Sequence, residues 1–174
     1  MNPTLIAGTQ GTPLVILNTA SYEAWLAEQQ SQVQNWLTQT SFSGTGLSLI
    51  PNTNGELALA LFVAKDLNHY FACGDLVSQL PQGQYALQAE QEHHQAIAFA
   101  WLVGGYRFER YKSDDKTLPV LAIDDQALVD NVVKQGEATA VVRDLVNTPA
   151  GDMMPENLGE TAEKMAERFG ASVS

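Results

Sequence analysis

Short apolar runs alternate with helical patterns along this 174-residue chain, and this alternation points to an α/β fold. Residues 12–18 form a β-branched and apolar run, which is typical of a strand buried on both faces. A helical pattern begins at Ser21, the expected N-cap. The Gln-rich stretch 28–34 is expected to divide this pattern into two helices.

Four later runs have the composition of strands, at residues 47–50, 56–63, 83–88 and 118–123. Asn54-Gly55 supplies the positive φ angles of a hairpin turn between the first two. Helices are predicted over 66–80 and from Ala89 to about Gly104, where two glycines end the second helix. The resulting expectation is a mixed sheet flanked by helices in three layers.

A long amphipathic helix follows the last strand, with Asp124 or Asp125 as its cap. It should end near Asn147, because Pro149 disfavours the helical conformation of the residue before it. Pro155 then opens a final helix. We expect an N-terminal α/β domain over residues 1–150 and a linker helix over 151–174 that leads into a further domain.

Composition excludes several classes of protein. The net charge of −11, from 20 acidic and 9 basic residues, suits neither a nucleic-acid backbone nor an anionic membrane. The single cysteine, Cys73, excludes an internal disulfide and is compatible with a reducing cytoplasm. No basic residue precedes the first apolar run, as a signal peptide would require, and no apolar window is long enough to cross a bilayer.

Candidate ligand residues are few. His69 and Cys73 lie four residues apart on the helix predicted over 66–80 and could form half of a zinc site. His93 and His94 are adjacent, so on a helix they point apart and cannot both complete such a site. A structural role is therefore favoured for all of them.

Three other features have a structural and a functional interpretation. Trp25 and Trp36 could form a ligand platform, but core anchoring is favoured because large aromatic side chains dominate burial. Gly44 and Gly46 lack the remaining residues of a phosphate loop. Residues 106–111 interleave aromatic and charged side chains, which indicates a buried aromatic row rather than a nucleic-acid or carbohydrate surface in so acidic a chain. We assign no catalytic, cofactor-binding or metal-binding residue.

Two segments resemble a known family. The run Arg143-Asp-Leu-Val-Asn147-Thr-Pro149-Ala-Gly-Asp-Met-Met-Pro155 is similar to the junction of the leucyl aminopeptidases, the M17 metallopeptidases, whose pattern is R-x-L-x-N-x-P-x-N followed by P-x-x-L-A. Residues 104–112 resemble the G-x-Y-x-F-x-x-Y-K segment of the same family. Gly151 departs from the pattern, and Met154 stands where Ser or Thr would cap the next helix, which weakens the helix start by about 1 kcal/mol.

The resemblance implies a specific protein. Such enzymes have a variable N-terminal α/β domain, similar in fold to macro domains, which a helix connects to a C-terminal catalytic domain. They form hexamers in the cytoplasm and remove N-terminal residues, often leucine, from peptides. Two divalent metals, zinc or manganese, polarise the scissile carbonyl and activate a water. Their Lys, Asp and Glu ligands belong to the catalytic domain, and none maps onto this chain.

The expected function is therefore that of a non-catalytic N-terminal domain, inactive alone, with roles in assembly and active-site access. Its expected partners are its own catalytic domain, further copies in a hexamer and the peptide substrate, with no membrane. The alternative is a macro-like module that binds a nucleotide or ADP-ribose, which rests on fold analogy alone. DNA binding is a third hypothesis, which the acidic charge disfavours.

Overall fold

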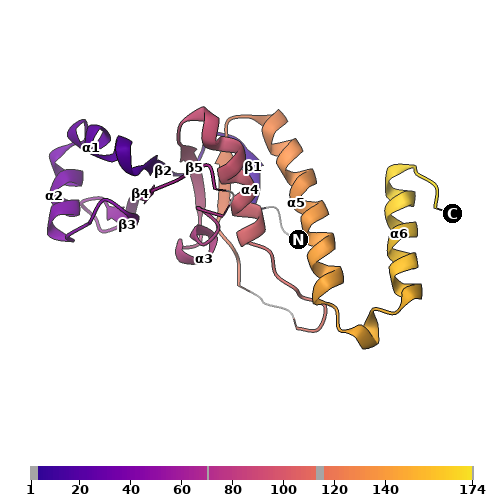
Figure 1. Ribbon diagram of the computed structural model, residues 1–174. Coiled ribbons are helices and arrows are strands. Elements are labelled where there is room, and N and C mark those ends of the chain that lie inside the picture. The colour runs from indigo at the N-terminus through magenta and orange to yellow at the C-terminus, as the bar shows by residue number, and fades with distance from the viewer. Residues whose placement is uncertain (1–3, 70, 113–115, 174) are drawn as a thin grey trace. The chain divides into compact units, whose positions relative to one another are not determined.

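The computed structural model describes residues 4–69, 71–112 and 116–173 (Figure 1). Two compact units make up the chain. The first comprises Met1–Tyr106 and Asp115–Gly136, and the second comprises Arg107–Asp114 and Glu137–Ser174. The boundary at residue 150 concerns a longer protein and stays a prediction.

The first unit contains a six-stranded sheet. Its strands are β1 (Leu5–Ala7), β2 (Thr12–Asn18), β3 (Gly46–Pro51), β4 (Leu57–Ala64), β5 (Gln84–Gln88) and β6 (Val120–Ile123). They are arranged in the order β1-β6-β5-β2-β4-β3, and all pairs are parallel except β3 with β4. The predicted mixed sheet is confirmed. The sequence pattern misses β1, because three residues are too few to show a strand period.

The first helices begin immediately after β2. The predicted division is confirmed as α1 (Thr19–Ala27) and α2 (Ser31–Gln39). The predicted cap is wrong, because Asn18 caps α1 and its Oδ1 accepts the Ser21 amide hydrogen at 2.8 Å. Asn18 is therefore both the last residue of β2 and the N-cap of α1.

The helix predicted over 66–80 is also wrong. Among the described residues of this range, only α3 (Leu76–Gln79) is helical. Asp66 Oδ1 accepts the Asn68 amide at 2.9 Å, and His69 Nδ1 accepts the Phe71 amide at 3.3 Å. Local side-chain bonds of this kind compete with helical ones and favour turns.

Hydrophobic clusters on both faces of the sheet confirm the flanking helices. Leu14 and Ile16 of β2 belong to a cluster with α3 and α4 (His94–Gly104), which follows the 3₁₀ turn η1 (Gln91–His93). Val15 points the other way, into a cluster with α1 and α2. Trp25 and Trp36 pack against this second cluster, so their predicted core role is confirmed.

The end of α4 approaches another backbone very closely. A Cβ atom on Gly104 would lie 1.9 Å from the carbonyl oxygen of Gly74, in the turn before α3. The predicted helix end is confirmed, but its glycines do not form a left-handed cap, since Gly105 has φ −80° and ψ −5°. Gly104 is required by packing instead.

Two long helices complete the chain. They are α5 (Gln126–Asn147) and α6 (Pro155–Phe169). Asp125, one of the two predicted caps, accepts the Leu128 amide hydrogen at 2.9 Å. Gly170 ends α6 in the left-handed conformation with φ 67°. Across the described residues, no helix combines the length and the apolar character needed to cross a membrane.

We expect Gly104→Ala to lower the free energy of unfolding by about 2–4 kcal/mol, because the new methyl group must displace the Gly74 backbone. Urea denaturation followed by circular dichroism measures this. Gly159→Ala is the control, since Gly159 lies within α6 with open space around its Cα. That change should cause no loss of stability. Equal stability of the two variants would show that the close approach is not essential.

Candidate functional site

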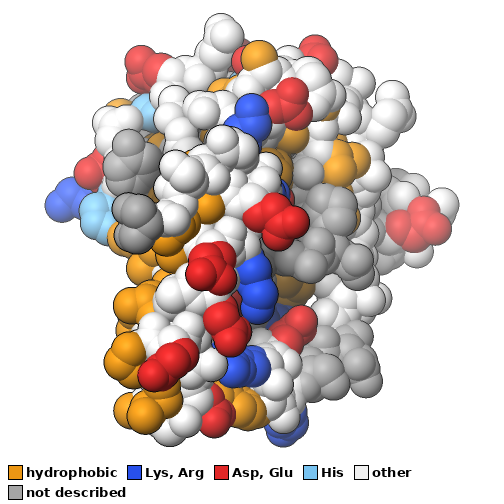
Figure 2. Space-filling model, turned by 90° about the vertical axis from the view of Figure 1, so that its right-hand side faces the viewer, with side chains coloured by type: hydrophobic (Ala, Val, Ile, Leu, Met, Phe, Trp, Pro, Cys, Tyr) orange, Lys and Arg blue, Asp and Glu red, His pale blue; other side chains and the backbone are white. Residues whose placement is uncertain are grey.

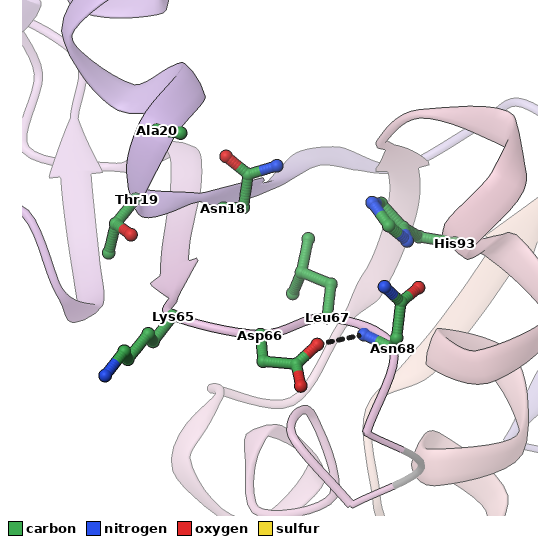
Figure 3. A pocket seen from close by; sticks show the side chains of 8 residues that line it. All are labelled: Asn18, Thr19, Ala20, Lys65, Asp66, Leu67, Asn68 and His93. Atoms are coloured by element: carbon green, nitrogen blue, oxygen red, sulfur yellow. Dashed lines mark hydrogen bonds between the residues drawn. The ribbon is translucent and has the colours of Figure 1, made fainter.

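A pocket of about 250 Å³ opens at the carboxyl edge of the sheet (Figure 3). It is lined by Asn18, Thr19, Ala20, Lys65, Asp66, Leu67, Asn68 and His93. These residues come from the end of β2 and the start of α1, from the loop after β4 and from the η1 turn after β5. Because β2, β4 and β5 are parallel, their carboxyl ends share this edge.

The pocket lies at a reversal in the sheet topology. After β2 the chain continues toward the sheet edge formed by β3, whereas after β5 it continues to β6, toward the opposite sheet edge formed by β1. Connections that leave adjacent strand ends in opposite directions open a crevice, and ligands of open α/β sheets bind in such crevices. The fold therefore supplies the setting of a binding site here.

His93 is the most unusual residue of the pocket. It is only 5% exposed, and its Nδ1 is buried without a hydrogen-bond partner among the described residues. Its Nε2 lies 3.5 Å from Glu92 Oε1 and 3.9 Å from Glu90 Oε2. A buried polar atom without a partner costs about 1–3 kcal/mol, so a bound molecule is one way to satisfy it.

Opposite charges stand at the rim of the pocket. Lys65 and Asp66 are both exposed, and the Asp66 carboxylate accepts the amide hydrogen of Asn68 (Figure 3). The N-terminus of α1 contributes the partial positive charge of its amide groups. Hydrogen-bond donors thus predominate over acceptors.

Metal-ligand candidates among the described residues form one group, Glu90, Glu92 and His93, whose ligand atoms lie within 4.8 Å of one another. His69 and Cys73 form no site, because His69 is exposed and its Nδ1 is bonded to the Phe71 amide, whereas Cys73 is buried. Burial raises the pKa of the Cys73 thiol to about 12, which keeps it protonated and unreactive.

In the second unit, residues from the two motif segments form hydrogen bonds with each other. Arg110 Nη1 donates to Thr148 Oγ1 at 3.2 Å, and the Tyr111 hydroxyl donates to the Asp152 carboxylate. The hydrogen bond to Asp152 raises the pKa of Tyr111. Thr148 is buried and donates in turn to the Asp144 carbonyl at 2.7 Å. These hydrogen bonds connect the two motif segments within the second unit.

Two details of this junction differ from expectation. The predicted burial of the aromatic row is wrong at Tyr111, which is 55% exposed although its ring packs edge-on against Phe108 at 5.8 Å. Met154 provides no polar cap, but Asn157 Oδ1 accepts the Met154 amide hydrogen at 3.0 Å. This bond supplies the reciprocal half of a capping box and secures the start of α6.

Among the pocket residues, the sequence patterns point only to His93 as a candidate binding group. They consider it only as one of the adjacent pair His93 and His94. His94 has a different neighbour, with its Nε2 3.1 Å from the Ala89 carbonyl oxygen. The available signal is positional: Asn18 ends one strand, and Lys65 follows another. It becomes useful only when the strand order is known.

Comparison with known proteins identifies the family. Residues 12–124 match the family described as M17 aminopeptidase, N-terminal domain. This is more than half of the chain. The chain belongs to the M17 aminopeptidase N-terminal domain family. The match covers strands β2 to β6 and helices α1 to α4, and it confirms the family that the motifs resemble.

Individual relatives support the assignment to this family. A probable cytosol aminopeptidase of Treponema denticola is 32% identical over 90 residues, which cover 46% of this chain and 19% of that protein. The crystal structure of the cytosol aminopeptidase of Coxiella burnetii matches with a TM-score of 0.87 and 26% identity. Tomato leucine aminopeptidase, with a TM-score of 0.65 and 19% identity over 95% of this chain and 42% of that one, shares the fold.

The M17 domain described here is short beside these relatives. The match to the Coxiella protein includes 98% of this chain but only 38% of the Coxiella chain. The activity, substrates and partners of the complete aminopeptidases are therefore not properties of this chain by similarity alone.

The burial of Cys73 predicts slow chemical modification. At pH 8 a thiol-specific disulfide reagent should react at least about 100-fold more slowly with the native chain than with the chain in denaturant, because the thiolate is the reactive form. Absorbance of the released chromophore gives both rates. Free cysteine in the same buffers controls for the reagent, and comparable native and denatured rates would contradict the burial.

Proposed function

We propose that this chain is the non-catalytic N-terminal domain of an aminopeptidase that removes N-terminal residues, leucine among them, from peptides. The family match over residues 12–124 carries the proposal. The names of the relatives add support for peptidase activity of the parent and for its cytoplasmic location.

The donor groups of this chain do not fit the expected metal centre. A two-metal aminopeptidase site with Lys, Asp and Glu ligands needs several carboxylates around two ions. The described residues offer Glu90, Glu92 and His93, which are close in sequence, and both carboxylates are exposed. Two divalent metals, zinc or manganese, are accordingly assigned to a catalytic domain elsewhere in the parent.

The second unit supports a role in joining domains. Its last helix, α6, has large apolar side chains at Leu158, Met165 and Phe169, which are 54%, 39% and 68% exposed. Figure 2 shows hydrophobic side chains at the surface beside acidic and basic ones. Apolar stripes of this kind usually pack against another element. We assign the catalytic domain of the parent as the element that covers α6.

Assembly and active-site access are the roles proposed for the domain within a hexameric parent. The junction supports them, because the Arg110–Thr148 and Tyr111–Asp152 hydrogen bonds fix the loop from which α6 departs. The macro-like interpretation of the fold remains an expectation from the resemblance.

The proposal predicts activity in the parent and none in this chain. The product of the complete reading frame should hydrolyse leucine p-nitroanilide with zinc or manganese and lose this activity with a chelator. The 174-residue chain should show no hydrolysis under the same conditions. Hydrolysis by the purified chain would refute the non-catalytic role, and an inactive, well-folded parent would refute the aminopeptidase assignment.

The apolar stripe gives a second prediction. In the isolated chain, the double variant Leu158→Ser with Phe169→Ser should bind less of a fluorescent apolar dye without lowering the stability of the first unit, because both side chains are exposed. In the parent it should cost about 1–2 kcal/mol per side chain, as the buried contacts are lost. Glu163→Ser, also exposed on α6, is the control. Unchanged stability of the parent would mean that α6 is not covered there.

A further inference from the structure

We propose that the pocket at the carboxyl edge of the sheet binds a phosphate group. The helix N-terminus of α1, the ammonium group of Lys65 and the imidazole of His93 would hold it. The proposal does not depend on the role assigned to the domain above.

The N-terminus of α1 provides directional donors. Asn18 already satisfies the Ser21 amide. The Ala20 amide belongs to the same first turn and has no acceptor within the helix. Thr19 and Ala20 both line the pocket. Helix N-termini with donors arranged in this way bind phosphate groups.

His93 supplies an independent reason to expect a ligand. Its side chain is 6% exposed, and its Nδ1 has no hydrogen-bond partner in the part of the chain that the structure describes. Figure 3 shows the ring projecting from the η1 side toward Asn18, with Leu67 and Asn68 near it. The carboxylates of Glu90 and Glu92 lie near Nε2 and so leave Nδ1 to a different partner.

Phosphate matches His93 in either protonation state. A neutral ring with its hydrogen on Nε2 presents Nδ1 as an acceptor, which can take the P–OH hydrogen of a phosphate monoanion. A protonated ring donates from Nδ1 to a phosphate oxygen.

The charges of the pocket favour an anion over a metal ion. Lys65 and the helix N-terminus are positive, and Asp66 is the one acid among the lining residues. Its carboxylate is bonded to the Asn68 amide. Glu90 and Glu92 do not line the pocket, although they approach the opposite nitrogen of His93.

The size of the pocket limits the ligand. A volume of about 250 Å³ is below the roughly 300–1,000 Å³ of typical sites for drug-sized ligands. It suits inorganic phosphate or the phosphoryl end of a small monoester, whose remainder would extend out of the opening. Inorganic phosphate and a phosphate monoester both present the phosphate group that the pocket would bind.

Amide-detected NMR of the complete 174-residue chain tests the proposal. The chain is titrated with inorganic phosphate, with adenosine monophosphate and with sodium chloride at matched ionic strength. We expect saturable shifts of the Ala20 amide with a Kd below about 1 mM for at least one phosphate compound, and none with chloride. Tighter binding of the monophosphate would identify an organic phosphate as the ligand, and equal affinity would identify phosphate itself.

Variants localise the site. Lys65→Gln removes the charge of an exposed side chain without disturbing the core, and should weaken binding about fivefold or more. His93→Gln should weaken binding too. Lys164→Gln, which neutralises an exposed lysine of α6, should change the Kd by less than about twofold.

Three results would overturn the proposal. They are the absence of saturable shifts with both phosphate compounds, equal weakening by Lys65→Gln and Lys164→Gln, and saturation of the same signals by Mg²⁺ or Zn²⁺ instead.

Discussion

The parallel pairing of β2 with both β4 and β5 is the constraint on which the rest of the first unit depends. A central strand has neighbours on both edges and must be covered on both faces, so its side chains alternate between two hydrophobic clusters. The same pairing brings three carboxyl ends to one edge. The pocket is therefore a consequence of strand order, and its residues need not be close in sequence.

Some features of the fold follow from local sequence and could be predicted, whereas others depend on side-chain bonds or tertiary contacts that the sequence pattern does not show. The strand at 12–18 was predictable because its apolar character follows directly from burial on both faces. The turns at 66–69 and 71–75 were not, since the apolar spacing of Leu67, Phe71 and Leu76 suggests a helical stripe, whereas the side-chain bonds of Asp66 and His69 favour turns. Gly104 shows the same limit: its place at a helix end was clear, but its contact with Gly74 depends on tertiary packing.

The junction and the pocket also differed in how far they could be predicted. Residues 106–111 and 143–155 were recognisable as family motifs, yet their mutual hydrogen bonds, through Arg110 and Tyr111, appear only in three dimensions. The pocket had no motif at all. Asn18, Lys65 and His93 are ordinary residues whose meaning comes from lying at the ends of neighbouring parallel strands.

A purely structural domain gives no physical reason for the environment of His93. Roles in assembly account for the junction and for the exposed apolar stripe of α6, because both are surfaces that another domain can use. They do not require a buried nitrogen without a partner, which costs about 1–3 kcal/mol in a fold whose total stability is only about 5–15 kcal/mol. An apolar side chain of similar size at position 93 would avoid that cost. The histidine therefore favours a ligand-binding role for the pocket in addition to the role in an aminopeptidase that we propose for the domain.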